Sequence, residues 1–182
     1  FYATNTGYTE TVAQEIYQAL GPGLVDACEN IEDLTLSDLQ GYDVLILGIA
    51  TWDAGDLPYD WANFYDVITD FDFTGTKVAF FGLGDQFGYG ETFLDAMGLV
   101  YRAFLKQGAI GRYGFWPIDG YDFDNSLALE DGQFCGLAID EDNESNLTTE
   151  RIVKWCSQIT RELGWTPVFR DTDEVSLAAA SP

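Results

Sequence analysis

The sequence predicts an α/β fold, a three-layer sandwich in which helices cover both faces of a five-stranded parallel sheet. Short, nearly continuous apolar runs, such as residues 44–49 and 77–81, are typical of strands that are buried on both faces. These runs alternate with amphipathic segments of helical period. Alternation of this kind favours a parallel sheet whose strands are joined by helical crossovers.

Each element follows from its local pattern. The chain opens on a strand end at 1–3, and the apolar spacing then predicts a helix over about 9–20. A capping box indicates a short helical turn that begins at Ser37. The remaining strands are expected at 24–28, 44–49, 77–81, 110–116 and 136–139, and the remaining helices at 59–68, 91–106 and 149–163.

The last two apolar runs lie too close together for a crossover helix between them. We therefore interpret residues 117–134, which are rich in Asp, Gly and aromatic residues, as an insertion that splits the fifth strand. A length of 182 residues predicts one domain, over 1–169, followed by a mobile tail over 170–182. The sequence does not begin with Met, so we expect a few preceding residues to be missing, and whether a targeting peptide is missing with them is left open. Every apolar run is too short to span a membrane.

The chain is strongly acidic, with 31 Asp and Glu residues against 8 Lys and Arg and a net charge of −23. This charge disfavours nucleic acid and anionic membranes as partners and favours a basic protein. Solubility or adaptation to salt is the alternative origin of the same bias. There is no histidine, and Cys28, Cys135 and Cys156 form no CxxC pair, so the sequence indicates reduced, packed thiols and no Cys/His metal site.

The first loop, residues 4–9 (TNTGYT), joins a strand end to a helix, which is the layout of an anion cradle. Backbone N–H groups and the dipole at a helix N-terminus favour negative charge there. The hydroxyls of Thr4, Thr6 and Thr9 can donate further hydrogen bonds. The first basic residue is Lys77, so a phosphate would be held by neutral donors alone. A simple helix cap is the alternative.

Two further loops, 51–57 (TWDAGDL) and 82–90 (GLGDQFGYG), follow predicted strands. The carboxyl ends of parallel strands meet at one edge, where ligands bind preferentially. Trp52 and Tyr89 are suited to flank a flat, fused-ring ligand, and Gly55 leaves the neighbouring backbone freer to reorient. The alternatives are aromatic rings folded onto the protein's own surface and an ordinary turn at Gly55.

The segments FYATNTGYTETVA, ATWDAGDLPYDW and FFGLGDQFGYGETF resemble, in order and spacing, the three FMN loops of flavodoxins. GYDF followed by LAIDEDNESNLT resembles the long-chain group, whose fifth strand is split by an extra loop. The resemblance covers nearly the whole chain apart from its tail. It implies the strand order 2-1-3-4-5, FMN as a non-covalent cofactor, and a low-potential one-electron carrier rather than an enzyme.

The resemblance also implies a role for individual residues. Trp52 would stack on the inner face of the flavin and Tyr89 on the outer face, while the peptide between Asp53 and Ala54 would turn toward flavin N5. Tyr8 and Asp53 depart from the family pattern, because many relatives carry Lys and Asn there. The full expected FMN-binding set is Thr4, Asn5, Thr6, Gly7, Tyr8 and Thr9 around the phosphate, Thr51, Trp52, Asp53, Ala54 and Gly55, and Gly84, Asp85, Tyr89 and Asp142.

The partners implied are basic redox proteins, such as photosystem I and a ferredoxin–NADP reductase, met by a monomer in the cytoplasm or the plastid stroma. We hypothesise that the acidic residues Asp53, Asp56 and Asp85 repel the reduced flavin and lower its second reduction potential.

Other protein classes fit less well. The alternative is an FMN-dependent quinone reductase of the same fold, against which a tyrosine over the ring argues. A phospho-receiver domain would need a carboxylate cluster at the first strand, where this chain has Thr and Asn. A P-loop NTPase is excluded by the lack of GxxxxGK(S/T), and a low-molecular-weight phosphatase by the lack of a loop cysteine.

Overall fold

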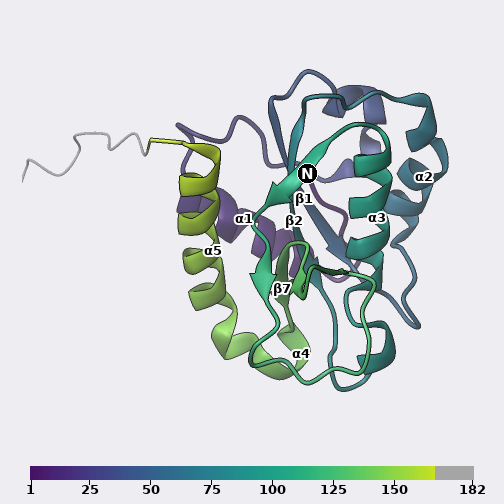
Figure 1. Cartoon of the computed structure of the whole chain (residues 1–182), viewed down its shortest axis with the longest axis vertical. Helices are drawn as coiled ribbons and strands as arrows, with labels where there is room; N and C mark the ends of the chain where they lie inside the picture. Colours follow the sequence, from purple (N-terminus) through teal and green to yellow (C-terminus); the bar gives the residue numbers. More distant parts are fainter. Residues whose placement is uncertain (167–182) are drawn as a thin grey trace, which may run out of the picture.

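The computed structural model describes residues 1–166, so the expected tail over 170–182 lies outside the described residues. A parallel sheet lies between two helical layers, as predicted. Figure 1 shows α1 and α5 on one side of the sheet and α2 and α3 on the other. The helices are α1 (Tyr8–Leu20), α2 (Tyr59–Val67), α3 (Asp95–Lys106), α4 (Glu141–Glu144) and α5 (Thr148–Leu163).

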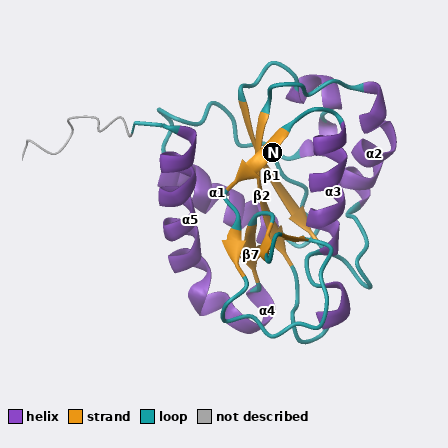
Figure 2. Cartoon of the chain, viewed as in Figure 1, coloured by secondary structure: helices purple, strands orange, loops and turns teal. Residues whose placement is uncertain are grey.

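The strands β1 (Val44–Ala50) and β2 (Lys77–Leu83) pair in parallel over their whole length at the centre of the sheet (Figure 2). On its other side, β2 pairs first with β3 (Ile110–Tyr113) and then, beyond a gap, with β7 (Leu137–Ile139). Because β3 and β7 occupy successive stretches of the same neighbour, they are two halves of one strand. The expected split of the fifth strand is confirmed.

The first two expected strands are reduced to isolated bridges. Tyr2 pairs in parallel with Gly48 of β1 and with Asn30, so the pairing runs Asn30, Tyr2, β1, β2, then β3 and β7. This is the sequence of neighbours expected for the order 2-1-3-4-5.

The strand predicted at 24–28 does not form. The N–H groups of Leu24 and Val25 donate instead to the carbonyl of Gly21, at 3.1 and 3.3 Å. The apolar residues on which the prediction was based therefore belong to the turn that follows α1. The parallel pairing with Tyr2 is made by Asn30 instead.

The first half of the fifth strand, β3, ends at Tyr113 rather than at the predicted residue 116. Gly114 has a φ of 72°, and its carbonyl accepts a hydrogen bond of 2.7 Å from Nε1 of Trp155. The left-handed backbone turns the chain out of the sheet. The insertion then forms a small antiparallel sheet of its own from β4 (Trp116–Pro117), β6 (Gln133–Phe134) and β5 (Leu129–Glu130).

Two helix starts were also mispredicted. The helix expected from residue 91 begins at Asp95, because Leu94 is buried with a left-handed φ of 61° and separates α3 from a 3-10 turn. The second misprediction concerns the capping box, which was expected to begin at Ser37. The observed N-cap is Thr35, two residues earlier, and its N–H donates to the carboxylate of Asp38 at 2.7 Å. The short helices are η1 (Ile31–Asp33), η2 (Leu36–Leu39), η3 (Ile68–Asp70), η4 (Gly90–Thr92) and η5 (Ser145–Leu147).

The core is aromatic-rich and closely packed. Trp61 of α2 is buried, and its Nε1 donates to the carbonyl of Gly48 at 2.8 Å. An added Cβ at Gly48 would lie 2.1 Å from Cζ of Phe81, so β1 accepts the Phe81 ring only because this position is glycine. The centre of the sheet is therefore fixed by packing as well as by its hydrogen bonds.

The cysteines in the described part are free thiols. Cys135 and Cys156 are buried, and burial raises the pKa of each thiol to about 12, which keeps both protonated and unreactive. Cys28 is partly exposed. Within residues 1–166, no helix is both long and apolar enough to cross a membrane.

Candidate functional site

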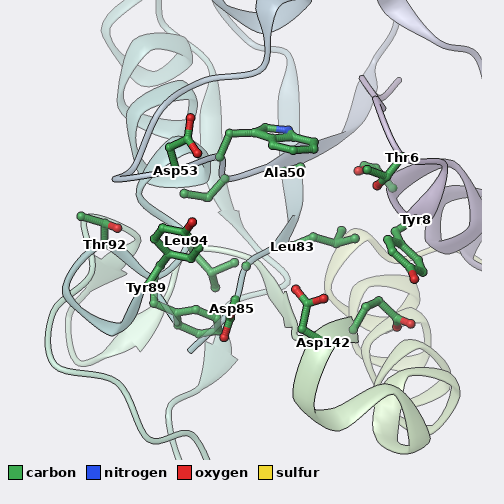
Figure 3. A pocket seen from close by; sticks show the side chains of 16 residues that line it. Thr6, Tyr8, Ala50, Asp53, Leu83, Asp85, Tyr89, Thr92, Leu94 and Asp142 are labelled. Atoms are coloured by element: carbon green, nitrogen blue, oxygen red, sulfur yellow. The ribbon is translucent and has the colours of Figure 1, made fainter. Parts of the chain in front are cut away.

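A pocket of about 290 Å³ opens at the edge of the sheet where the loops after β1, β2 and β7 meet the start of α1. Figure 3 shows Thr6 and Tyr8 on one side and Asp53, Thr92 and Tyr89 on the other. Its volume is close to the lower limit of the usual range for small-molecule sites. It is lined by Thr6, Tyr8, Thr9, Ala50, Thr51, Trp52, Asp53, Leu83, Gly84, Asp85, Tyr89, Thr92, Phe93, Leu94, Glu141 and Asp142.

The three predicted loops thus converge on one pocket. Some of the predicted site residues do not line it, namely Thr4, Asn5, Gly7, Ala54 and Gly55. The Oγ1 atom of Thr4 accepts a hydrogen bond of 2.9 Å from the Gly7 N–H, which closes the first loop on itself.

Sequence reasoning missed several lining residues, Ala50, Leu83, Thr92, Phe93, Leu94 and Glu141. Ala50 and Leu83 end the two central strands, so their position directly before a predicted loop was a usable signal. Leu94 lines the pocket because its backbone is left-handed, and the apolar pattern of the sequence does not predict that conformation.

The first loop leads into α1 with neutral donors only. Gly7 caps the helix with a φ of 89°, and its carbonyl accepts from the N–H of Thr11 at 3.0 Å. Thr9 is almost fully buried, and Thr6 and Thr9 both line the pocket. Among the described residues that line the pocket there is no Lys or Arg. An anion here would be held by hydroxyls, N–H groups and the helix dipole.

The second loop is a tight hairpin. Trp52 and Asp56 exchange backbone hydrogen bonds of 3.0 and 2.7 Å, and Gly55 between them has a φ of 101°. Asp53 has a left-handed φ of 42°, a region that Asp tolerates better than most residues. Ala54 is exposed at the tip. The Asp53-Ala54 peptide therefore occupies the part of the hairpin that packs least against the protein.

Two polar atoms beside the pocket have no hydrogen-bond partner within the described chain. They are the Oγ1 atom of Thr51 and the Nε1 atom of Trp52, and both are buried. An unsatisfied buried polar group costs about 1–3 kcal/mol. Trp52 Nε1 is a donor only, so a ligand would satisfy it by presenting an acceptor.

The third loop is braced by Asp85. Its carboxylate accepts from the N–H groups of Gly88 at 2.7 Å and Phe87 at 3.0 Å and from the Nδ2 of Asn143 at 2.8 Å. These bonds, the one from Gly88 foremost, hold the pKa of Asp85 below its ordinary value. Asp85 lines the pocket, yet its carboxylate is occupied by the loop itself. Tyr89, 48% exposed, lies at the rim.

The acidic residues after β7 make this edge of the pocket electronegative. The pKa of Asp142 is raised, first by partial burial of its carboxyl and then by the charges of Asp85 and Asp140. Asp140 is fully buried and caps α4 by accepting from the Asn143 N–H at 3.0 Å. The sequence prediction included Asp142 but not Asp140. The arrangement offers two aromatic rings, a neutral anion cradle and nearby negative charge.

The comparisons with known proteins agree on one family. A family model described as flavodoxin matches residues 1–155. A flavodoxin from Synechococcus elongatus is 46% identical over 164 residues, covering 90% of this chain and 96% of that protein. Flavodoxin 2 from Escherichia coli is 44% identical over 165 residues, covering 90% and 94%.

A solved structure agrees with these sequence relatives. The crystal structure of Fusobacterium nucleatum flavodoxin bound to flavin mononucleotide superposes with a TM-score of 0.82 at 34% identity, covering 89% of this chain and 95% of the other. With a family model spanning most of its length, this chain belongs to the flavodoxin family.

Proposed function

We propose that this flavodoxin is a low-potential, one-electron carrier that uses non-covalently bound FMN, over a domain formed by residues 1–169. The observation that carries the proposal is a pocket lined by Trp52 and Tyr89, in which the buried indole Nε1 of Trp52 has no hydrogen-bond partner in the described chain. A fused-ring ligand with polar substituents would stack on the rings and supply an acceptor for this N–H.

The residues present fit the parts of FMN. Thr6 and Thr9 beside the N-terminus of α1 would hold the phosphate, with Thr4, Asn5, Gly7 and Tyr8 in the same loop. The rings of Trp52 and Tyr89 supply faces for stacking on the flavin. The hydroxyl of Thr51, whose Oγ1 has no partner in the described chain, would donate a hydrogen bond to the cofactor or accept one from it. When bound, FMN supplies the electron-transfer chemistry.

The rest of the proposed site consists of the hairpin tip and the acidic edge. The exposed peptide between Asp53 and Ala54 would turn toward flavin N5, with Gly55 as its pivot. Asp142 and Asp85, together with Gly84, would face the ring edge or the ribityl chain. Their charge would disfavour additional electrons on the cofactor and so keep its second reduction potential low.

The proposed partners are basic redox proteins. A net charge of −23 supports electrostatic steering of such partners and argues against nucleic acid. Because several similar flavodoxins come from cyanobacteria, photosystem I and a ferredoxin–NADP reductase are the specific partners we propose. The protein would act as a monomer in the cytoplasm or the plastid stroma.

The proposal is tested by titrating the apoprotein with FMN and following the loss of flavin fluorescence and the visible spectrum. Binding with a shifted flavin spectrum is expected. Riboflavin, which has the ring but not the phosphate, is the matched ligand control and should bind more weakly. Folded protein that leaves FMN fluorescence unchanged would contradict the proposal. Steady-state oxidation of NADPH by the isolated holoprotein would favour an enzyme instead.

A further inference from the structure

Gln86 is a polar side chain buried inside the third loop, with only 2% of its surface exposed. Its Nε2 donates to the carboxylate of Asp140 at 2.9 Å, and its backbone N–H donates to the same oxygen at 3.1 Å. Its Oε1 accepts from the Asp122 N–H at 2.7 Å. One amide thus connects the 84–90 loop to the end of β7 and to the insertion.

Asp140 depends on this contact. Its side chain is fully buried, and its hydrogen bonds come from the N–H groups of Gln86 and Asn143. A buried carboxylate must be supplied with donors, because burial without them is costly. The Nδ2 of Asn143 also donates to Asp85 at 2.8 Å, so this cluster continues to the residue that braces Gly88.

The insertion contacts the far end of the same loop. The carbonyl of Gly90 accepts from the N–H groups of Asp124 and Asn125, each at 3.0 Å. Two residues therefore tie the loop to the insertion, Gln86 near its start and Gly90 at its end. Tyr89, half exposed at the pocket rim, lies between these ties in the sequence.

We propose that Gln86 is a positioning residue that fixes the 84–90 loop against β7 and the insertion and thereby holds the Tyr89 ring over the pocket. The inference rests on the proposed function, because it takes Tyr89 to cover the flavin. It assigns a role to the insertion as well. The 117–134 segment supplies the N–H groups that keep the cofactor loop in place.

The test uses Gln86→Met, which keeps the side-chain length and removes both hydrogen bonds of the amide. FMN affinity of the apoprotein should fall by about 10-fold, since a buried acceptor and a buried donor lose their partner. Hydrogen exchange at the amides of Asp122 and Gly88 should accelerate in both apoprotein and holoprotein. In a Tyr89→Ala background the effect of Gln86→Met on FMN affinity should largely vanish.

Gln158→Met is the matched control. The Nε2 of Gln158 donates to the carbonyl of Phe115 at 2.9 Å, a partly buried side-chain amide bond that does not involve the 84–90 loop. It should change FMN affinity by less than about 2-fold. If Gln86→Met does not fold, hydrogen exchange of the unmodified protein is the second measurement. The Asp122 amide, which donates to Gln86, should be protected in both apoprotein and holoprotein, and rapid exchange there would overturn the role of Gln86.

The outcomes separate the two proposals. If the unmodified protein does not bind FMN, the proposed function fails, while hydrogen exchange still reports whether Gln86 fixes the loop. If the unmodified protein binds FMN and Gln86→Met leaves affinity and exchange unchanged, the positioning role is wrong. The positioning role would also be wrong if Gln86→Met reduced FMN affinity equally in the unmodified and Tyr89→Ala backgrounds, because Gln86 would then not act through the Tyr89 ring.

Discussion

The backbone N–H of Thr51 donates a 2.8 Å hydrogen bond to the carbonyl of Leu83, at the point where the second and third loops leave the sheet. One strand further on, the Gly84 N–H donates to the carbonyl of Ile139 at 3.1 Å. The ends of β1, β2 and β7 are therefore joined at the edge of the pocket. Loops that carry function are best placed when they leave a rigid scaffold such as this.

Trp52 should contribute to FMN binding by both its face and its N–H. Trp52→Ala removes the stacking surface and should weaken binding by about 10–100-fold, since stacking on an aromatic ring is worth about 1–3 kcal/mol. Trp52→Phe keeps a ring but removes the Nε1 donor, so an intermediate loss is expected. Fluorescence titration of the apoproteins measures both, and Tyr65→Ala on α2, outside the pocket, is the control. Equal affinities for all variants would contradict the stacking role.

The acidic residues that line the pocket should lower the second reduction potential of bound FMN. A unit charge about 8 Å away in a water-like medium is worth ~0.5 kcal/mol, which corresponds to about 20 mV for a one-electron couple. Asp142→Asn and Asp53→Asn should each raise that potential by about this amount. Potentiometric titration of the holoproteins gives the shift. Asp85→Asn is a less direct variant, because it alters the carboxylate that accepts from Gly88 and Phe87.

Asp95 should destabilise the fold near neutral pH, whereas Asp85 should stabilise it there. Burial raises the pKa of Asp95 above its ordinary value of 3.8, so its charged form costs stability near neutral pH. Asp95→Asn should therefore be more stable than the unmodified protein near neutral pH. That advantage should shrink as the pH falls through the raised pKa and disappear below 3.8.

Asp85 is the control of opposite sign. Its lowered pKa means that it stabilises the fold above 3.8 and loses this effect as the pH falls through the lower folded value. Asp85→Asn should be less stable than the unmodified protein near neutral pH and equally stable in strong acid. Urea unfolding across this pH range distinguishes the two. A pH profile of the same sign for both variants would contradict the assignment.

Much of this architecture was predictable from the sequence, because burial on both faces of a parallel sheet leaves a direct signal. The apolar runs of β1 and β2 and the helical spacing of α1 and α5 were located within a few residues of their bounds. The elements that differed depend on single backbone conformations. Leu94 and Gly114 adopt positive φ angles, and these end or delay elements that the apolar pattern continues.

The site was predictable to the extent that it uses strand ends. Loops that follow adjacent parallel strands must meet, so Trp52, Asp85 and Tyr89 were placed together in advance. Asp140 and Gln86 were not recognised, because an Asp and a Gln carry no sequence signal of burial. Their importance arises from hydrogen bonds between residues that are 54 positions apart.

Arg151 should contribute more to stability than the other ion-paired basic residues. It is 9% exposed, pairs with Glu144 at 2.7 Å and lies 4.3 Å from the centre of the Tyr121 ring. Arg151→Met should lower the free energy of unfolding by about 1–3 kcal/mol, because Glu144 loses its partner and the ring loses a cation. Lys154→Met breaks an ion pair in which both side chains are 64% exposed, and it should cost less than about 0.5 kcal/mol. Urea unfolding that ranks the two variants equally would contradict this difference.

Electron transfer to a basic reductase should slow as salt is added. A net charge of −23 attracts such a partner over distances that shrink as the Debye length falls to about 8 Å at physiological ionic strength. The second-order rate constant from stopped-flow mixing should drop by about 10-fold or more between low and high salt. A small uncharged quinone as electron acceptor is the control, and its rate should stay nearly constant. If the reductase and the quinone show the same flat dependence, encounter is not steered by charge, and the acidic surface must be attributed to solubility or to adaptation to salt.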